Sequence, residues 1–229
     1  MKLFVIEGVD GAGKSTQIKL LKDYFKKLGN KCEYLHFPRT DAPYFGELVA
    51  RFLRGEFGSL NEVNPYLVAM LYAGDRKDAS DLLGNWLKEG RIVLLDRYTY
   101  SNIAYQCAKL ESAQEQDKLM QWILSLEFNH FKIPRPDLNI FLDVPHHFTE
   151  KKLSGSRLGE DRNYLKGTRD IHEESLDFQR KVREIYLSVS AMDERLAVID
   201  CSNERGEMLP PSEIFSRMIR LLTSRNLIG

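Results

Sequence analysis

The sequence contains little cysteine, which argues against a protein held together by disulfides or zinc. Only three of its 229 residues are cysteine, and Cys32, Cys107 and Cys201 lie far apart with no C-x-x-C pair. An odd number of separated cysteines is typical of reduced thiols inside the cell. We therefore expect a cytoplasmic protein with no disulfide and no zinc site, in which Cys107 and Cys201 are packing residues.

The sequence also lacks an excess of either charge and any long apolar run. Lys plus Arg and Asp plus Glu both number 33, so the formal net charge is zero. Without a basic excess the chain is not expected to bind nucleic acid or a membrane surface. No apolar run approaches the length of a membrane span, and we expect no signal peptide, because a strand-like segment begins at Leu3. With 43% hydrophobic residues, residues 1–229 are expected to form one domain.

One pattern in the sequence points to a bound nucleoside triphosphate. Residues 8–15 match G-x-x-x-x-G-K-[ST], between an apolar run that predicts a strand and a segment that predicts a helix. Glycines let the backbone N–H groups surround a phosphate chain, and the start of the following helix adds a positive dipole end. Lys14 can reach the β- and γ-phosphates, and the Ser15 hydroxyl can bind Mg²⁺. The pattern predicts a phosphate loop formed by Gly8, Val9, Asp10, Gly11, Ala12, Gly13, Lys14, Ser15 and Thr16.

Apolar strands alternate with helices along the chain. Strands are expected over 3–6, 32–37, 91–96, 138–144 and 196–200, and helices over 16–28, 45–53, 64–88, 101–110, 114–129, 178–189 and 214–222. Apolar strands separated by helices favour a parallel sheet covered on both faces. We therefore predict an α/β fold of the P-loop NTPase type, with a five-stranded parallel sheet flanked by helices on both faces.

Charged side chains follow the ends of three predicted strands. Lys14 belongs to the loop after the first strand, Arg39 follows the second, and Asp96 and Arg97 end the third. Ligands of such sheets bind outside the carboxyl ends of the strands. Arg39 and Arg97 are therefore expected to clamp a second phosphate group. Asp96 is expected to help Ser15 hold Mg²⁺.

Two further segments predict contacts with a nucleotide. Tyr72 and Arg76 are four residues apart in a predicted helix, so they share one face and suit a flat heteroaromatic ligand; a core Tyr with a surface Arg remains the alternative. The polar stretch at about 154–169 contains Arg157 and Arg162 and fits a mobile lid for phosphoryl transfer. His146, His147 and His172 lack a matching third metal ligand and are interpreted as helix-start or surface residues.

Several motifs together resemble the thymidylate kinase family. Residues 94–106, LLDRYTYSNIAYQ, resemble the family signature, and EGVDGAGKST from Glu7 to Thr16 resembles its phosphate loop. Phe37-Pro38-Arg39, residues 71–76, Pro136-Asp137 and residues 173–186 follow in the family order. The resemblance implies transfer of the γ-phosphoryl group of ATP to dTMP, with Mg²⁺, in a homodimer built from helices.

The resemblance also implies roles for individual residues. Arg39 and Arg97 would hold the dTMP phosphate, Tyr72 would stack on thymine in place of the usual Phe, and Asp10 would bind the 3′-hydroxyl. Arg76 and Asn102 would read the base edge, and Tyr105 would crowd the 2′ position. The expected dTMP-binding residues are Asp10, Phe37, Arg39, Tyr72, Arg76, Arg97, Ser101, Asn102, Tyr105 and Gln106.

The catalytic residues implied by the resemblance include two lid arginines. Gly11 occupies the phosphate-loop position at which some members carry an arginine, and members with glycine place the catalytic arginine in the lid. Lys14, Arg97, Arg157 and Arg162 are therefore the expected catalytic residues. Arg157 is the expected ATP-side residue and Arg162 the candidate for the transferring phosphoryl group.

Three other functions compete with this interpretation. A different nucleoside monophosphate kinase of the same fold, for example one acting on UMP, would use a similar set of residues. A GTPase-type switch would need an N-K-x-D motif, which the sequence lacks, and the D-x-x-G match at 81–84 falls inside a predicted helix. An ATP-dependent ligase or transporter subunit would need further domains.

Overall fold

The computed structural model describes residues 2–145, 147–149, 164–165, 170–172 and 175–228. Five strands form one sheet in the order β2-β3-β1-β4-β5, and every neighbouring pair is parallel. The strands are β1 (Lys2–Glu7), β2 (Cys32–His36), β3 (Ile92–Asp96), β4 (Leu138–Asp143) and β5 (Leu196–Asp200). The predicted α/β class and five-stranded parallel sheet are confirmed.

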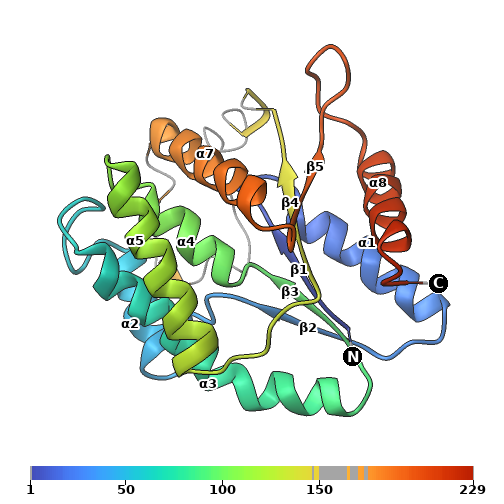
Figure 1. The fold of residues 1–229 in the computed structure, drawn as a ribbon, viewed down its shortest axis with the longest axis horizontal. Coiled ribbons are helices and arrows are strands. Elements are labelled where there is room, and N and C mark those ends of the chain that lie inside the picture. Colours follow the sequence, from blue (N-terminus) through green and yellow to red (C-terminus); the bar gives the residue numbers. More distant parts are fainter. Residues whose placement is uncertain (1, 146, 150–163, 166–169, 173–174, 229) are drawn as a thin grey trace.

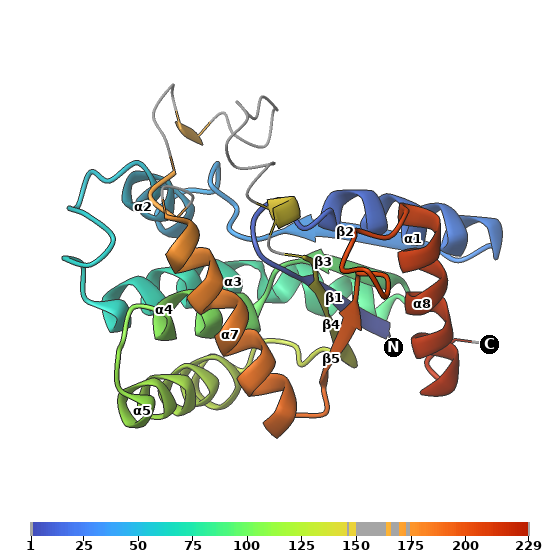
Figure 2. The ribbon, with the colours of Figure 1, turned by 90° about the horizontal axis from the view of Figure 1, so that it is seen from above.

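The helices cover both faces of this sheet. Those described are α1 (Lys14–Lys27), α2 (Phe45–Leu53), α3 (Pro65–Lys88), α4 (Thr99–Cys107), α5 (Ala113–Leu124), the π-helix η1 (Ser125–His130), α7 (Leu176–Met192) and α8 (Pro211–Ser224). Figures 1 and 2 show α1 and α8 together on one face and α3, α4, α5 and α7 on the other, with α2 beside α3. This arrangement is what right-handed crossover connections between parallel strands produce.

Strand β1 is buried on both faces at the centre of the sheet. Phe4 and Ile6 pack in the cluster that includes α1, whereas Leu3 and Val5 pack in the cluster that includes α3. Successive side chains of a strand point to opposite faces, so a strand covered twice reads as a continuous apolar run. Burying such a side chain is worth about 1.5–3 kcal/mol, which makes this strand a principal source of stability.

Local signals in the sequence set most of the helix ends. The side chain of Asn64 accepts a hydrogen bond from the Tyr66 N–H at 2.9 Å and Pro65 begins α3, as predicted. Gly29 and Gly90, with φ of 77° and 72°, follow the ends of α1 and α3. The helix predicted over 114–129 differs: α5 ends at Leu124 and its last turn continues as the π-helix η1.

The strand order brings the predicted functional residues to one edge of the sheet. β2, β3 and β1 are neighbours, so the segments that follow them meet at their carboxyl ends. Cys107 and Cys201 are buried in the main core, as predicted. Among the described residues, no helix combines the length and the apolar character that crossing a membrane requires.

Candidate active site

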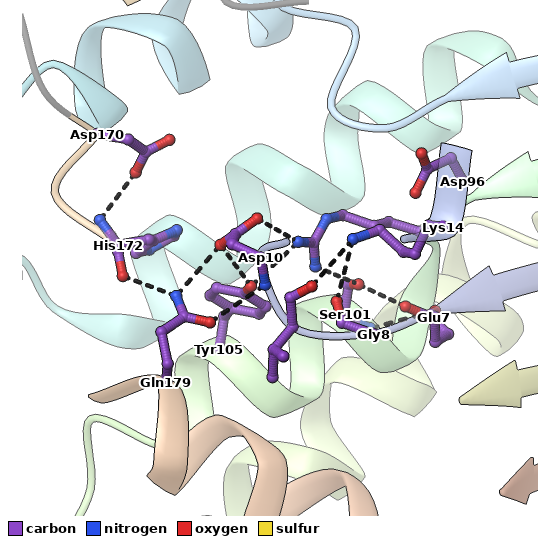
Figure 3. A network of polar contacts seen from close by, with 12 residues as sticks. Glu7, Gly8, Asp10, Lys14, Asp96, Ser101, Tyr105, Asp170, His172 and Gln179 are labelled. Carbon is purple, nitrogen blue, oxygen red and sulfur yellow. Dashed lines mark hydrogen bonds and ion pairs between the residues drawn. The ribbon is translucent and has the colours of Figure 1, made fainter. Parts of the chain in front are cut away.

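The phosphate loop connects β1 to α1 and is anchored by its own apolar residues. Val9 and Ala12 are buried in the core, so the loop is fixed from below. Gly11 and Gly13 adopt φ of 80° and 83°, a left-handed conformation that favours glycine, and Gly13 begins α1. The Lys14 ammonium lies within the curve of the loop, 3.3 Å from the Gly8 carbonyl oxygen and 3.2 Å from that of Val9 (Figure 3). The sequence pattern therefore forms the expected loop.

The surroundings of Lys14 change its proton affinity. Burial, together with the positive charge of Arg97, lowers the pKa of Lys14 to about 8, although Asp96, Asp10 and Glu7 oppose this change. An ammonium held this way is partly deprotonated near pH 8 until an anion reaches it. Lys14 therefore lies within the loop, and its charge depends on burial and on the charged groups around it.

Asp96 ends β3 and faces the same region as Lys14 (Figure 3). It is buried, and its Oδ2 lies 3.4 Å from His36 Nδ1. Although burial by itself would raise it, the nearby Lys14, His36 and Arg97 hold the pKa of Asp96 below its usual range. Its Oδ1 has no hydrogen-bond partner among the described residues. A buried carboxylate oxygen of this kind is a hard oxygen ligand of the type that Mg²⁺ prefers, and Ser15, at the start of α1, is exposed.

Arg97 joins the phosphate loop to a cavity that lies beside it. Its Nη2 donates to Asp10 Oδ1 at 2.6 Å and to the Tyr105 hydroxyl at 3.1 Å, and its Nη1 donates to Ser101 Oγ at 3.2 Å. The Tyr105 hydroxyl in turn donates to Asp10 Oδ2 at 2.8 Å. Gln179 of α7 donates to Asp10 Oδ2 at 3.2 Å. Asp10 is therefore paired within the protein, and Arg97 is held at the boundary between the two sites.

This cavity gathers most of the residues predicted to bind the acceptor. It is polar and apolar in comparable measure and contains two arginines. The residues that line it are Asp10, His36, Phe37, Pro38, Thr40, Leu53, Tyr72, Arg76, Arg97, Tyr98, Ser101, Asn102, Tyr105, Gln106, Tyr164, Asp170 and His172. Nine of the ten residues expected to bind dTMP are among them, and Arg39 is the exception.

One wall of the cavity carries a set of fixed polar groups. The buried Arg76 donates to both carboxylate oxygens of Glu127, at 2.7 and 2.6 Å. Asn102 Nδ2 donates to Glu127 Oε1 at 3.0 Å, and Thr99 donates to Oε2 at 2.8 Å. Glu127 belongs to η1, so the π-helical turn supplies the carboxylate that orients Arg76 and Asn102. Asn102 Oδ1 and both polar atoms of the Gln106 side chain are buried without a partner among the described residues.

Arg39 lies at the rim and is bound to α3. Its Nε donates to Asp75 Oδ1 at 2.9 Å and its Nη2 to the Asp75 carbonyl oxygen at 2.8 Å. The backbone N–H of Arg39 donates to Asp75 Oδ2 at 2.8 Å. The structure therefore holds Arg39 near the cavity but does not bring its guanidinium into the lining.

Residues that precede α7 close another side of the cavity. The Ile171 N–H donates to the Leu53 carbonyl oxygen at 3.1 Å, and Arg54 Nη1 donates to the Tyr164 carbonyl oxygen at 2.8 Å. Tyr164 donates from its hydroxyl to Asp170 Oδ2 at 2.6 Å. These bonds fix Tyr164 and Asp170 against α2, where both side chains line the cavity.

The interpretation of His172 as a surface residue is wrong. Its side chain is buried, and its ring packs against Tyr105, Phe52 and Phe178 with centroids 4.9, 5.6 and 5.7 Å away. Burial lowers the pKa of His172 well below its usual value, so the ring is neutral. The sequence interpretation failed because the aromatic partners come from three different elements. His147 is exposed, whereas His146 lies outside the described residues.

Two predicted residues cannot be placed, and several others were missed. Arg157 and Arg162 lie outside the described residues. Glu7 and Glu127 are buried carboxylates whose roles the sequence interpretation missed; the signal was an acid within an apolar segment. Gln179, which contacts Asp10, had no comparable signal.

Comparisons with known proteins agree with this geometry. A model of the family described as Thymidylate kinase matches residues 6–209. The chain is 34% identical over 223 residues to a probable thymidylate kinase of Pyrobaculum aerophilum, covering 96% of this chain and 99% of that protein. It is 32% identical over 190 residues to the thymidylate kinase of Mycobacterium tuberculosis, covering 82% of this chain and 86% of that protein.

A solved structure supports the fold. The thymidylate kinase of Candida albicans superimposes with a TM-score of 0.72 at 22% identity, covering 98% of this chain and 92% of that chain. The family match over most of the chain, together with a phosphate loop beside an acceptor cavity, leads to one conclusion: the chain belongs to the thymidylate kinase family, whose enzymes transfer the γ-phosphoryl group of ATP to dTMP, giving dTDP and ADP.

Proposed function

We propose that the cavity lined by Tyr72 and Arg97 is the dTMP site and that the phosphate loop is the ATP site. The observation that carries this assignment is the position of Arg97, which contacts Asp10 of the loop and Ser101 and Tyr105 of the cavity. A cation at this boundary can reach a phosphate from either side. Arg97 and Lys14 would then neutralise charge as the phosphoryl group is transferred, which is the main task in this chemistry.

The base of dTMP would lie against Tyr72, with its polar edge toward Arg76, Asn102 and Gln106. Asn102 Oδ1 is a buried acceptor without a described partner, which suits the imino N–H of thymine. Arg76 uses its Nε and Nη2 on Glu127, which leaves Nη1 for a ring carbonyl. This fixed set of donors and acceptors favours one base edge over others.

The sugar and phosphate would occupy the opposite side of the cavity. Asp10 would accept a hydrogen bond from the 3′-hydroxyl. The Tyr105 ring, which lies beside Asp10, would crowd a ribose 2′-hydroxyl. Phe37 would form part of the floor. Arg97 and Arg39 would bind the phosphate, which requires Arg39 to exchange part of its contact with Asp75 for the ligand.

A magnesium ion would be held by Ser15 and Asp96. Asp96 Oδ1, which has no hydrogen-bond partner among the described residues, and the hydroxyl of Ser15 would supply oxygen ligands of the right type. When bound, the ion neutralises charge on the β- and γ-phosphates. Lys14 would supply the matching charge from the protein.

Three broader features complete the proposal. Residues 154–169 would close as a lid that brings Arg157 and Arg162 over the nucleotides, since Gly11 leaves the phosphate loop without an arginine. The enzyme would form a homodimer through helices, and α3 leaves Leu67 and Met70 exposed for such a contact. A cytoplasmic location is supported by the three free cysteines.

A panel of nucleoside monophosphates tests the assignment of the acceptor site. dTMP, dUMP, UMP and ribo-TMP are offered with ATP and Mg²⁺ to the wild type and to Tyr105→Ala, and diphosphate formation is measured. We expect the wild type to prefer dTMP and the variant to gain on UMP and ribo-TMP relative to dTMP. An unchanged ratio of ribose to deoxyribose substrates would remove Tyr105 from sugar selection.

A further inference from the structure

Glu7 is a buried carboxylate that lies beside the acceptor cavity without belonging to its lining. It ends β1 immediately before the phosphate loop and has no exposed surface. Oε1 accepts the backbone N–H groups of Tyr98 and Ser101 at 3.0 and 3.3 Å. Oε2 accepts the hydroxyls of Ser101 and Tyr186 (Figure 3 shows the contact with Ser101). Burying a carboxylate among neutral donors costs folding free energy, so we expect Glu7 to have a role in the site.

Two bonds connect β1 to the backbone around Arg97. The backbone of Arg97 adopts φ of 66°, which is uncommon for a residue other than glycine and needs support from the surrounding structure. Its own N–H donates to the Ile6 carbonyl oxygen at 3.0 Å, and the next N–H, of Tyr98, donates to Glu7 Oε1. Consecutive residues of β1 thus hold the peptide groups on both sides of the Arg97 Cα. Glu7 thereby stabilises the unusual backbone conformation from which the Arg97 side chain extends to the cavity.

Ser101 links Glu7 to the Arg97 guanidinium through two hydrogen bonds. Ser101 Oγ accepts from Arg97 Nη1 at 3.2 Å and donates to Glu7 Oε2. Tyr186 of α7 lies 2.7 Å from the same Oγ and 2.9 Å from Oε2, which fixes the geometry from the other side. The serine hydroxyl therefore has its proton directed at Glu7 and its lone pairs available to Arg97.

We propose that Glu7 is a positioning residue for the acceptor phosphate, acting through Ser101 and the Arg97–Tyr98 peptide to hold Arg97 in its binding pose. The inference rests on the role of Arg97 given under the proposed function. The proposal predicts that loss of the Glu7 charge reduces the part of the dTMP affinity that comes from the phosphate. The part that comes from the nucleoside should be unchanged.

The test compares Glu7→Gln with the wild type by titration calorimetry against dTMP and against thymidine, which lacks the phosphate. The ratio of the thymidine Kd to the dTMP Kd measures the phosphate contribution. Gln keeps the size of the side chain and can accept the two N–H groups. We expect the ratio to fall about tenfold or more, because hydrogen bonds to charged groups are stronger than those between neutral groups, with the thymidine Kd within about twofold of wild type.

Asp143→Asn provides the matched control. Asp143 ends the neighbouring strand β4, and its carboxylate pairs with Arg183 of α7 rather than with Arg97, so it also ties the sheet to that helix. This control should leave the ratio near the wild-type value. A similar fall in both variants, or an equal weakening of both ligands in Glu7→Gln, would reduce Glu7 to a structural role and overturn the proposal.

Arg97→Met separates this inference from the proposed function. If that variant leaves the ratio unchanged, the assignment of Arg97 to the phosphate fails. If it lowers the ratio while a folded Glu7→Gln does not, only the positioning role fails. Should Glu7→Gln not fold, Ser101→Ala removes the side-chain bridge alone and should lower the ratio several-fold; no fall would contradict the proposal. In the Arg97→Met background, Ser101→Ala should cost nothing further.

Discussion

Lys14 lies where the charges of two binding sites meet, and its protonation reports what is bound. Asp96, Asp10 and Glu7 attract its proton, whereas burial and Arg97 repel it, and the result is a pKa of about 8. A polyphosphate beside the ammonium favours the charged form and raises this pKa. At a pH between the lower pKa of Lys14 in the free enzyme and its higher pKa in the complex, Lys14 must therefore take up a proton when the polyphosphate binds.

We predict proton uptake when ATP binds at pH 8, approaching half a proton from Lys14, and a smaller uptake from this group at pH 6.5, where it is already protonated. Titration calorimetry in two buffers with different ionisation enthalpies measures the uptake. Lys14→Met should remove the difference between the two pH values and should abolish most activity. Equal uptake at pH 8 in the wild type and Lys14→Met would show that another group titrates.

Tyr72 offers a second prediction about a single side chain. It lines the acceptor cavity, and the phosphate loop lies on the other side of Arg97. Tyr72→Ala should therefore weaken dTMP binding by about 1–3 kcal/mol, the cost of losing a stacked ring, and leave ATP binding nearly unchanged. Tyr72→Phe keeps the ring and should bind dTMP almost as the wild type does. If Tyr72→Ala weakened dTMP and ATP binding equally, Tyr72 would be a packing residue of the core and not a contact of the base.

At the level of elements, the crossing of α2 and α3 depends on glycine. A Cβ on Gly46 of α2 would lie 2.0 Å from the Arg39 carbonyl oxygen, and one on Gly74 of α3 would lie 2.4 Å from the Phe45 ring. The close approach places Arg39 beside Asp75. The packing of α2 against the segment that precedes it thus helps to position an arginine expected to bind the phosphate.

Gly46→Ala should push the Arg39 segment away from α2, lowering the free energy of unfolding by about 1–3 kcal/mol, the usual cost of overpacking, and weakening dTMP binding. Gly84→Ala in α3 is the control, since its Cβ would meet no atom within 4 Å. That variant should be stabilised by up to about 1 kcal/mol, because alanine favours a helix over glycine. Thermal and urea unfolding measure both. A Gly46→Ala protein as stable as the wild type would contradict the account.

Elements that depend on local signals could be predicted from the sequence, and those that depend on distant partners could not. The cap at Asn64 and the apolar runs of the strands are local, so α3 and the sheet were predicted correctly. The turn that carries Glu127 is π-helical, and that carboxylate is explained only by Arg76, 51 residues earlier. His172 is buried by Phe52 and Tyr105, which no pattern near it in the sequence indicates.

For the whole molecule, catalysis by a lid predicts a split between rate and affinity. An arginine that meets the phosphoryl group only in the transition state raises kcat and leaves ground-state binding unchanged. We expect Arg162→Ala to lower kcat by about a hundredfold or more with little change in the dTMP Kd, and Arg157→Ala to affect mainly ATP. Arg180→Ala, an exposed arginine of α7, is the control. If both lid variants keep a kcat near wild type, charge neutralisation must come from Arg39, Arg97 or the metal.

The central position of β1 has a consequence for how the chain folds. Phe4 pairs with Leu94 on one side and Leu138 on the other, so both hydrogen-bonding edges of this strand are completed by segments far along the chain. Closing loops of this length costs entropy before any pairing energy is gained, and such topologies fold slowly. A nascent chain that stops short of Leu138 would expose one edge of this apolar strand. Until then the phosphate loop has an incomplete foundation, and the unfinished edge is the point at which chaperones or aggregation compete for the chain.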